Sequence, residues 1–183
     1  MPTDRQHEPA PLVRPFPAVG RLMSLAYREL DLAANGTQEQ IHVLGDPRHL
    51  PRPWDPATCR APLLREEVWT WLDAVVTWLN HEYTWDVHGT VPSCWPRHPH
   101  LVHEVAVLAD QRRAADGALT SEALEDWHRY SLPYFTERLL LRVKDHCEEG
   151  HQPSPSKGRH TRHLSEGSRR GRDDAYMEDL RSL

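Results

Sequence analysis

Residues 92–104, PSCWPRHPHLVHE, concentrate side chains that can bind a metal or take part in catalysis. Cys94, His98 and His103 have the spacing C-x3-H-x4-H, and a helix beginning directly after His98 would place His100 on the same face as His103. Zinc binds thiolate and imidazole donors from short local sets, usually four at a time. The candidate ligands of a structural or hydrolytic zinc site are therefore Cys94, His98, His100 and His103.

The same stretch also fits a purely architectural role. Its spacing matches no standard zinc finger, no second CxxC-type pair accompanies it, and 13 histidines in 183 residues make some clustering expected. His98 precedes Pro99 and can cap a helix there, while Cys94 and Trp95 would be buried packing residues. Under this favoured interpretation the protein has no cofactor, and zinc is the alternative.

A third possibility is a cysteine nucleophile, which needs a histidine base and a further group that orients it. Cys94 or Cys147 could supply the thiol, but no orienting Asn or Asp and no oxyanion hole is identifiable. The sequence also lacks the GxGxxG, P-loop, HExxH, GxSxG and EF-hand motifs. The sequence therefore favours a non-enzymatic protein and assigns no catalytic residue.

Helical periodicity indicates the elements that would position these residues. The strongest pattern is LLREEVWTWLDAVVTWLNHEY, residues 63–83, where apolar residues recur every three or four positions. A second helix should begin at Pro99, since proline suits the first helical position, and end near Gly117. Shorter helices are predicted between Val19 and Asn35 and after residue 120, where Pro133 should break or kink the helix.

These elements predict an all-α domain of three to five helices over residues 18–147. Within it, residues 45–62 carry five prolines and should form an extended loop, and residues 41–45, IHVLG, could be a short strand without an evident partner. Residues 1–17 are proline-rich and lack periodicity, so we expect a disordered lead-in. Residues 148–183 are expected to be a disordered tail with a short terminal helix.

Charge and cysteine content restrict the predicted cellular compartment and the predicted classes of binding partner. The net charge is −5, and from residue 148 onward seven basic residues balance seven acidic ones, so the excess acid lies in residues 1–147. This distribution argues against a large nucleic-acid-binding face on the helical domain. Three cysteines, no apolar leader and no apolar run long enough to span a bilayer predict a cytoplasmic protein without membrane contact.

The tail contains the one basic stretch of the chain. Residues 157–172, KGRHTRHLSEGSRRGR, hold six basic residues and one acidic residue. Such a segment can contact phosphates weakly and without sequence preference, or can serve only as a solubilising tail. The candidate nucleic-acid contacts are Lys157, Arg159, Arg162, Arg169, Arg170 and Arg172. The terminal DDAYMEDLRSL carries net negative charge, opposite to the preceding stretch. It could form a helix that docks on an unknown protein partner or folds back onto the arginines.

The stretch CWPRHPHLVHEVAVL, followed by Trp127, Pro133 and Cys147, resembles an uncharacterised actinobacterial domain family encoded on plasmids, conjugative elements and phages. The resemblance covers residues 64–147, and it departs from the family in the order Cys94-Trp95 and in His100, where the family often has an acid. It implies an accessory or interaction protein of a mobile genetic element, in which the histidine stretch is architecture. The positions that carry it are Trp95, His98, Pro99, Trp127 and Cys147.

Overall fold

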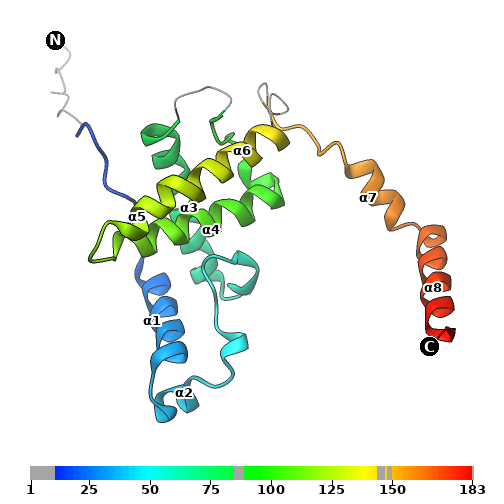
Figure 1. The fold of residues 1–183 in the computed structure, drawn as a ribbon, viewed down its shortest axis with the longest axis horizontal. Coiled ribbons are helices and arrows are strands. Elements are labelled where there is room, and N and C mark those ends of the chain that lie inside the picture. Colours follow the sequence, from blue (N-terminus) through cyan, green and yellow to red (C-terminus); the bar gives the residue numbers. More distant parts are fainter. Residues whose placement is uncertain (1–10, 85–88, 144–146, 148–149, 183) are drawn as a thin grey trace. The chain divides into compact units, whose positions relative to one another are not determined.

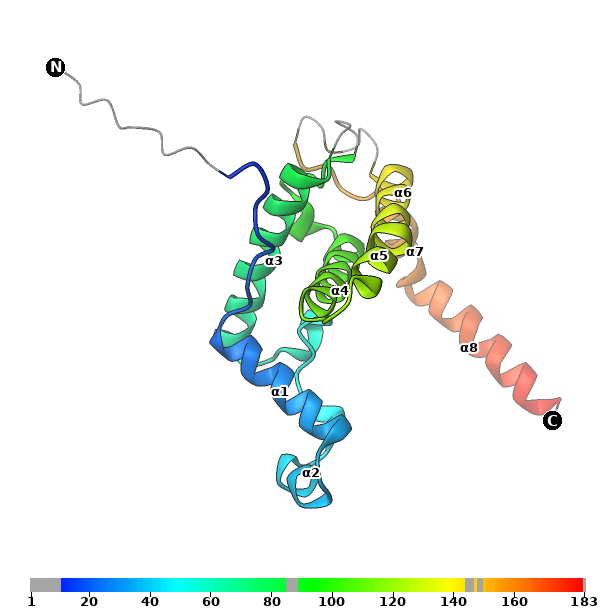
Figure 2. The same cartoon turned by 60° about the vertical axis from the view of Figure 1, so that its left-hand side comes forward.

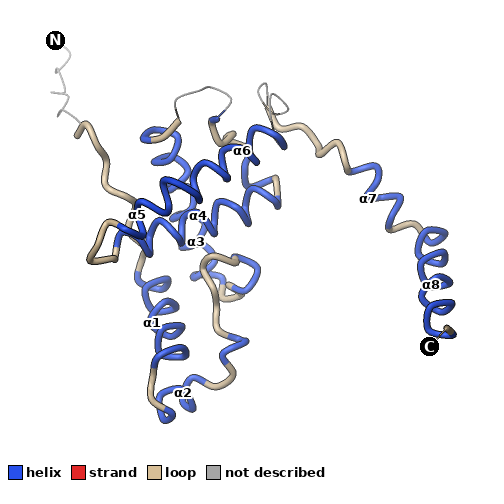
Figure 3. Tube along the Cα trace, in the orientation of Figure 1, coloured by secondary structure: helices blue, strands red, loops and turns tan. Residues whose placement is uncertain are grey.

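The computed structural model describes residues 11–84, 89–143, 147 and 150–182, and its regular elements are helices (Figures 1 and 3). Over these residues no β-strand occurs, only an isolated bridge between Arg52 and Asp55. The all-α prediction is confirmed, although the helices outnumber the three to five that the sequence predicts. The chain divides into two compact units, residues 1–145 and residues 146–183.

The first unit contains the two longest of the described helices and the hydrophobic core cluster. Its α-helices are α1 (Arg21–Asn35), α2 (Gln38–Leu44), α3 (Pro62–Glu82), α4 (Pro99–Asp116), α5 (Glu122–Asp126) and α6 (Leu132–Arg142). A π-helical turn, η5 (Trp127–Ser131), joins α5 to α6, and 3-10 turns span Pro47–His49 (η1), Pro56–Thr58 (η2) and Trp95–Arg97 (η4). These bounds confirm the helices predicted at residues 63–83 and from Pro99.

The core forms where α4 lies between two neighbours. Helix α4 contacts α3 on one side and the α5–η5–α6 segment on the other, and α1 packs on α3 (Figures 1 and 2). Both α3 and α4 begin with proline, whose missing N–H costs nothing in a first helical turn. Helix α3 is apolar around much of its circumference because it has neighbours on several sides; its buried residues are Leu64, Val68, Trp71, Leu72, Val75, Val76, Trp78 and Leu79.

The predicted break at Pro133 is a widened helical turn rather than an interruption. Proline at position 133 has no N–H to donate and its ring would clash with the carbonyl of Arg129 in a regular α-helix. The π-helical turn Trp127–Ser131 directly precedes α6 and accommodates this change. It also turns Trp127 inward, where the side chain is 2% exposed and its indole N–H donates to the carbonyl of Leu108 at 3.1 Å.

Residues 41–45 are not a strand, because residues 41–44 belong to α2 and Gly45 is its C-cap. Thr37 and Gln40 form a capping box: the Thr37 hydroxyl accepts from the Gln40 N–H, and the Gln40 side chain accepts from the Thr37 N–H. Gly45 ends the helix with a positive φ of 76°, a conformation that favours glycine. Two local capping signals therefore outweigh the β-branched residues Ile41 and Val43.

The predicted lead-in is partly ordered. Residues 1–10 lie outside the described residues, but Arg14–Pro17 runs along α3, and Phe16 packs against the core. Helical periodicity could not reveal this segment, because it is extended and its contacts lie more than 50 residues away in the sequence. The ordered domain thus begins before the predicted boundary at residue 18.

The second unit is helical where a disordered tail was predicted. It contains α7 (Lys157–His163) and α8 (Glu166–Arg181), and Ser165 caps α8 by accepting from the Ser168 N–H. Neither helix has a buried residue. The predicted terminal helix is present and extends over 16 residues. Among all helices that the structure describes, none has both the length and the apolar character that a bilayer crossing demands.

Candidate metal centre

Cys94 and His98 are brought together by one 3-10 turn. The turn η4 separates them, with the Arg97 N–H donating to the Cys94 carbonyl at 2.9 Å and the His98 N–H to the Trp95 carbonyl at 3.0 Å. The Cys94 Sγ then lies 3.4 Å from the His98 Nε2. His98 also begins α4, because its carbonyl accepts from two N–H groups of the first helical turn. The pair is therefore fixed by the helix start that the His-Pro step dictates.

Cys147 and His151 repeat the same C-x3-H spacing. The Gly150 N–H donates to the Cys147 carbonyl at 3.3 Å. Gly150 has a φ of 124°, a backbone conformation that favours glycine, so this position next to His151 has a clear sequence requirement. Cys147 is buried and His151 is exposed.

The donor atoms of Cys94, His98, Cys147 and His151 all lie within 4.8 Å of one another. In a tetrahedral zinc site with Zn–S near 2.3 Å and Zn–N near 2.0 Å, neighbouring donor atoms are about 3.3–3.8 Å apart. The 3.4 Å separation of the Cys94 and His98 donors falls inside that interval. We call these four residues the Cys/His cluster; its composition, two thiols and two imidazoles, is one that zinc prefers.

The cluster keeps two of the four ligands that the sequence predicts. His100 and His103 are not among its members. The His100 ring is 5.8 Å from that of His98, and its Nε2 is buried with no hydrogen-bond partner among the described residues. Burial, together with the positive charge of Arg142, lowers the pKa of His100 against the opposing effect of Glu104. His103 instead lines an open groove between α4 and α6.

Cys147 and His151 were missed as ligands although the signal was in the sequence. The predicted ligands all lie within a few residues of His98, as in compact zinc fingers, whereas a ligand pair can lie far away in the chain. The signal that would have found them is the repetition of C-x3-H at residues 94–98 and 147–151. The sequence indicates Cys147 only as a position of the family resemblance and as a possible nucleophile.

Helix α3 holds the loop that carries Cys94. The Asn80 side chain donates to the Val91 carbonyl at 3.0 Å and accepts from the Val91 N–H at 2.9 Å. Val91 is 2% exposed, so both of its backbone groups would otherwise be buried without a partner. Trp95 follows Cys94, is 2% exposed and packs on Trp69 with ring centroids 5.9 Å apart.

The third cysteine is separate from the cluster. Cys59 is 1% exposed and its thiol lies 3.7 Å from the Arg52 carbonyl, within the proline-rich loop ahead of α3. Burial raises the pKa of the Cys59 thiol, against smaller lowering effects from Thr58 and Arg65. A buried thiol with a raised pKa is a poor nucleophile and behaves as a packing residue.

Comparison with known proteins adds no relative: no family model, curated protein or solved structure matches the chain. The resemblance to the actinobacterial family and its mobile-element context therefore stay predictions. The positions that carry it have clear structural roles, with Trp95 and Trp127 in the core and Pro99 at the first position of α4.

Proposed function

We propose that this is a zinc-binding helical protein in which Cys94, His98, Cys147 and His151 hold one structural Zn²⁺ ion. The observation that carries the proposal is the mutual approach of four donor atoms to within 4.8 Å. Two thiolates and two neutral imidazoles would balance the charge of Zn²⁺, and four protein ligands complete its usual tetrahedral shell. A filled shell leaves no position for a water nucleophile, so a structural role is favoured over a hydrolytic one.

The burial of the donors supports the same role. His98 is 6% exposed and Cys147 is 7% exposed, while Cys94 is half-buried and His151 lies at the surface. Such a site shields two of its four donor residues from bulk water, and the exposed His151 leaves an entry path for the ion. Because ligands far apart in sequence come together only in the folded chain, the free energy of binding zinc would stabilise the fold.

Elemental analysis of the tag-free full chain tests the proposal. We expect about one zinc per chain after purification without chelators. Cobalt substitution should give the visible absorption bands of a tetrahedral thiolate site, and the variants Cys147→Ser and His151→Ala should lose both signals. Chelation should lower the thermal midpoint of the unmodified protein more than that of either variant.

Matched variants distinguish the Cys/His cluster from the local set of ligands that the sequence predicts, which includes His100 and His103. The double variant His100→Ala/His103→Ala should retain zinc and cobalt absorption, and so should Cys59→Ser. If the double variant loses the metal while His151→Ala keeps it, the ligands are the local set. If the unmodified chain takes up neither zinc nor cobalt, the proposal is wrong.

We propose further that the protein works through interactions with other macromolecules rather than as an enzyme. The absence of reaction-centre motifs from the sequence and a four-ligand site support this view. A turnover assay over a broad substrate panel tests it: activity abolished by Cys94→Ala but retained in Cys59→Ser would contradict the proposal.

A further inference from the structure

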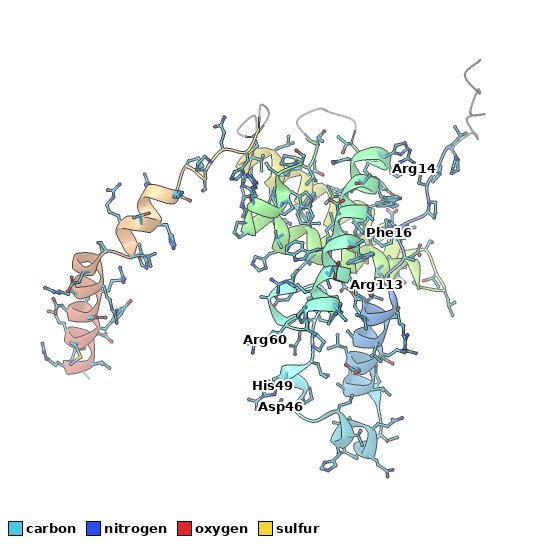
Figure 4. The ribbon with its side chains drawn as sticks, turned by 180° about the vertical axis from the view of Figure 1, so that it is seen from behind. Arg14, Phe16, Asp46, His49, Arg60 and Arg113 are labelled. Carbon is cyan, nitrogen blue, oxygen red and sulfur yellow. The ribbon has the colours of Figure 1, made fainter. Side chains whose placement is uncertain are left out.

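Residues 14–17, the N-terminal strap, lie along one face of α3. The indole N–H of Trp78 donates to the Arg14 carbonyl at 3.0 Å, and that of Trp71 donates to the Pro17 carbonyl at 2.9 Å. The Arg14 N–H donates to the Glu82 carboxylate at 3.2 Å. The strap therefore runs antiparallel to α3, and Figure 4 shows Arg14 and Phe16 beside that helix.

The strap has the sequence of a polyproline II segment, Arg-Pro-Phe-Pro. The rings of Pro15 and Pro17 fix their own φ, and each proline restricts the residue before it to extended conformations. Three residues of polyproline II rise about 9 Å, and the seven residues from Trp71 to Trp78 rise about 10 Å along a helix. The spacing of the two indole donors along α3 therefore matches the spacing of two strap carbonyls that lie one polyproline turn apart.

Aromatic rings surround the side chain between the two prolines. Phe16 meets Trp71 and Trp78 edge-on, with ring centroids 6.2 and 5.0 Å apart. The Arg112 guanidinium lies 5.1 Å from the centre of the Phe16 ring and is itself 9% exposed. Aromatic-lined surfaces recognise proline-rich peptides in other proteins, because such a ligand is already rigid.

We propose that this face of α3, formed by Trp71, Trp78 and Glu82, is a recognition surface for proline-rich peptides, and that the strap occupies it in cis. Its hydrogen bonds go to backbone groups of the strap, so a proline-rich segment of another protein can make the same contacts. The tethered strap competes at an effective concentration in the millimolar range. A partner therefore binds when its own segment fits better or when the strap is weakened.

The test uses the full chain carrying Phe16→Ser and a labelled peptide of residues 11–19, PLVRPFPAV. We expect saturable binding at least tenfold tighter than to the unmodified chain. At a peptide concentration about tenfold above its dissociation constant, the thermal midpoint of the variant should rise by about 3–5 °C. If Phe16→Ser does not fold alone, the same peptide should restore its helical circular dichroism.

Additional Trp→Phe changes in the Phe16→Ser chain identify the surface. Trp78→Phe keeps a ring but removes the N–H, and should weaken peptide binding at least fivefold, whereas Trp69→Phe should leave it unchanged. A peptide with Pro15 and Pro17 replaced by Gly should not compete. If the PLVRPFPAV peptide neither binds nor stabilises the Phe16→Ser chain, the proposal is overturned. It is also overturned if the chains associate only as a dimer that exchanges straps, and the added peptide changes neither binding nor the thermal midpoint.

Discussion

At the scale of single residues, Glu67 shows how a side chain from one helix can start another. The N-cap of α1 is Gly20, which has no side chain to cap the helix. The Glu67 carboxylate of α3 replaces it by accepting from the Leu22 and Met23 N–H groups at 3.1 and 2.7 Å. A Cβ on Gly20 would lie 2.4 Å from the Glu67 carboxyl carbon, so glycine is required for this approach.

Replacing Glu67 with alanine should lower the free energy of unfolding by about 1–2 kcal/mol, because two helix N–H groups lose a charged acceptor. The neighbouring variant Glu66→Ala is the matched control and should cost less than about 0.5 kcal/mol, since that side chain is exposed. Urea unfolding of both variants gives the two values. Equal losses would show that the Glu67 bonds contribute nothing specific.

Cys59 gives a second prediction at this scale. Because burial raises the pKa of its thiol, Cys59 carries less thiolate at pH 8 than an ordinary cysteine and should be alkylated more slowly. Its labelling rate should continue to rise with pH beyond the range where a free thiol reaches its plateau. Mass spectrometry of iodoacetamide-labelled peptides, with urea-unfolded protein as the control, measures the rate. Labelling as fast as in the unfolded chain would contradict the prediction.

At the scale of elements, the parts predicted from sequence are those whose signals are local. Helices α3 and α4 were predictable because apolar spacing and a first-position proline lie within the segments that fold. The strap was not predictable, because its partners on α3 lie more than 50 residues away. The Cys/His cluster was recognisable only by pairing two C-x3-H repeats that lie roughly 50 residues apart. Helix α7 was missed since its charged, glycine-containing sequence lacks an apolar stripe.

Asn80 connects the element scale to the metal site. The variant Asn80→Ala should leave the buried Val91 N–H and carbonyl unpaired, at a cost of about 2–3 kcal/mol in unfolding free energy. Because Val91 is three residues before Cys94, zinc affinity should also fall, as measured by competition with a chromogenic chelator. Asn80→Asp keeps the acceptor and should lose less of both quantities. If the Asn80→Ala protein is destabilised but its zinc affinity is unchanged, the hydrogen bonds between Asn80 and Val91 do not support the metal site.

At the scale of the whole molecule, charge is distributed unevenly, and the basic residues of the second unit are already partly paired. Arg170 pairs with Glu166, Arg169 lies 3.9 Å from Asp173, and Arg172 donates to the His163 carbonyl at 3.0 Å. These contacts compete with any phosphate for the same arginines. Of the six candidate phosphate contacts, the three on α7 are therefore more available to phosphates than the three on α8. They are Lys157, Arg159 and Arg162.

We therefore expect weak duplex DNA binding without sequence preference. The logarithm of its association constant should fall with the logarithm of salt concentration at a slope of about −3, rather than the slope of about −5 expected for six free contacts. A full-length variant with Lys157, Arg159 and Arg162 replaced by Gln should lose most of this binding and keep its zinc. Mobility shifts at several salt concentrations measure both slopes. Undiminished binding by the triple variant would place the contact elsewhere.

The strap also constrains when the domain can close during synthesis. Arg14 leaves the ribosome 68 residues ahead of its partner Glu82, which corresponds to about 3–14 s at ordinary elongation rates. For most of that interval Phe16 has no completed helix to pack against, because Trp71 and Trp78 emerge only near its end. The first ligand to reach the face of α3 is then decided by proximity, since the tethered strap has only a short distance to travel.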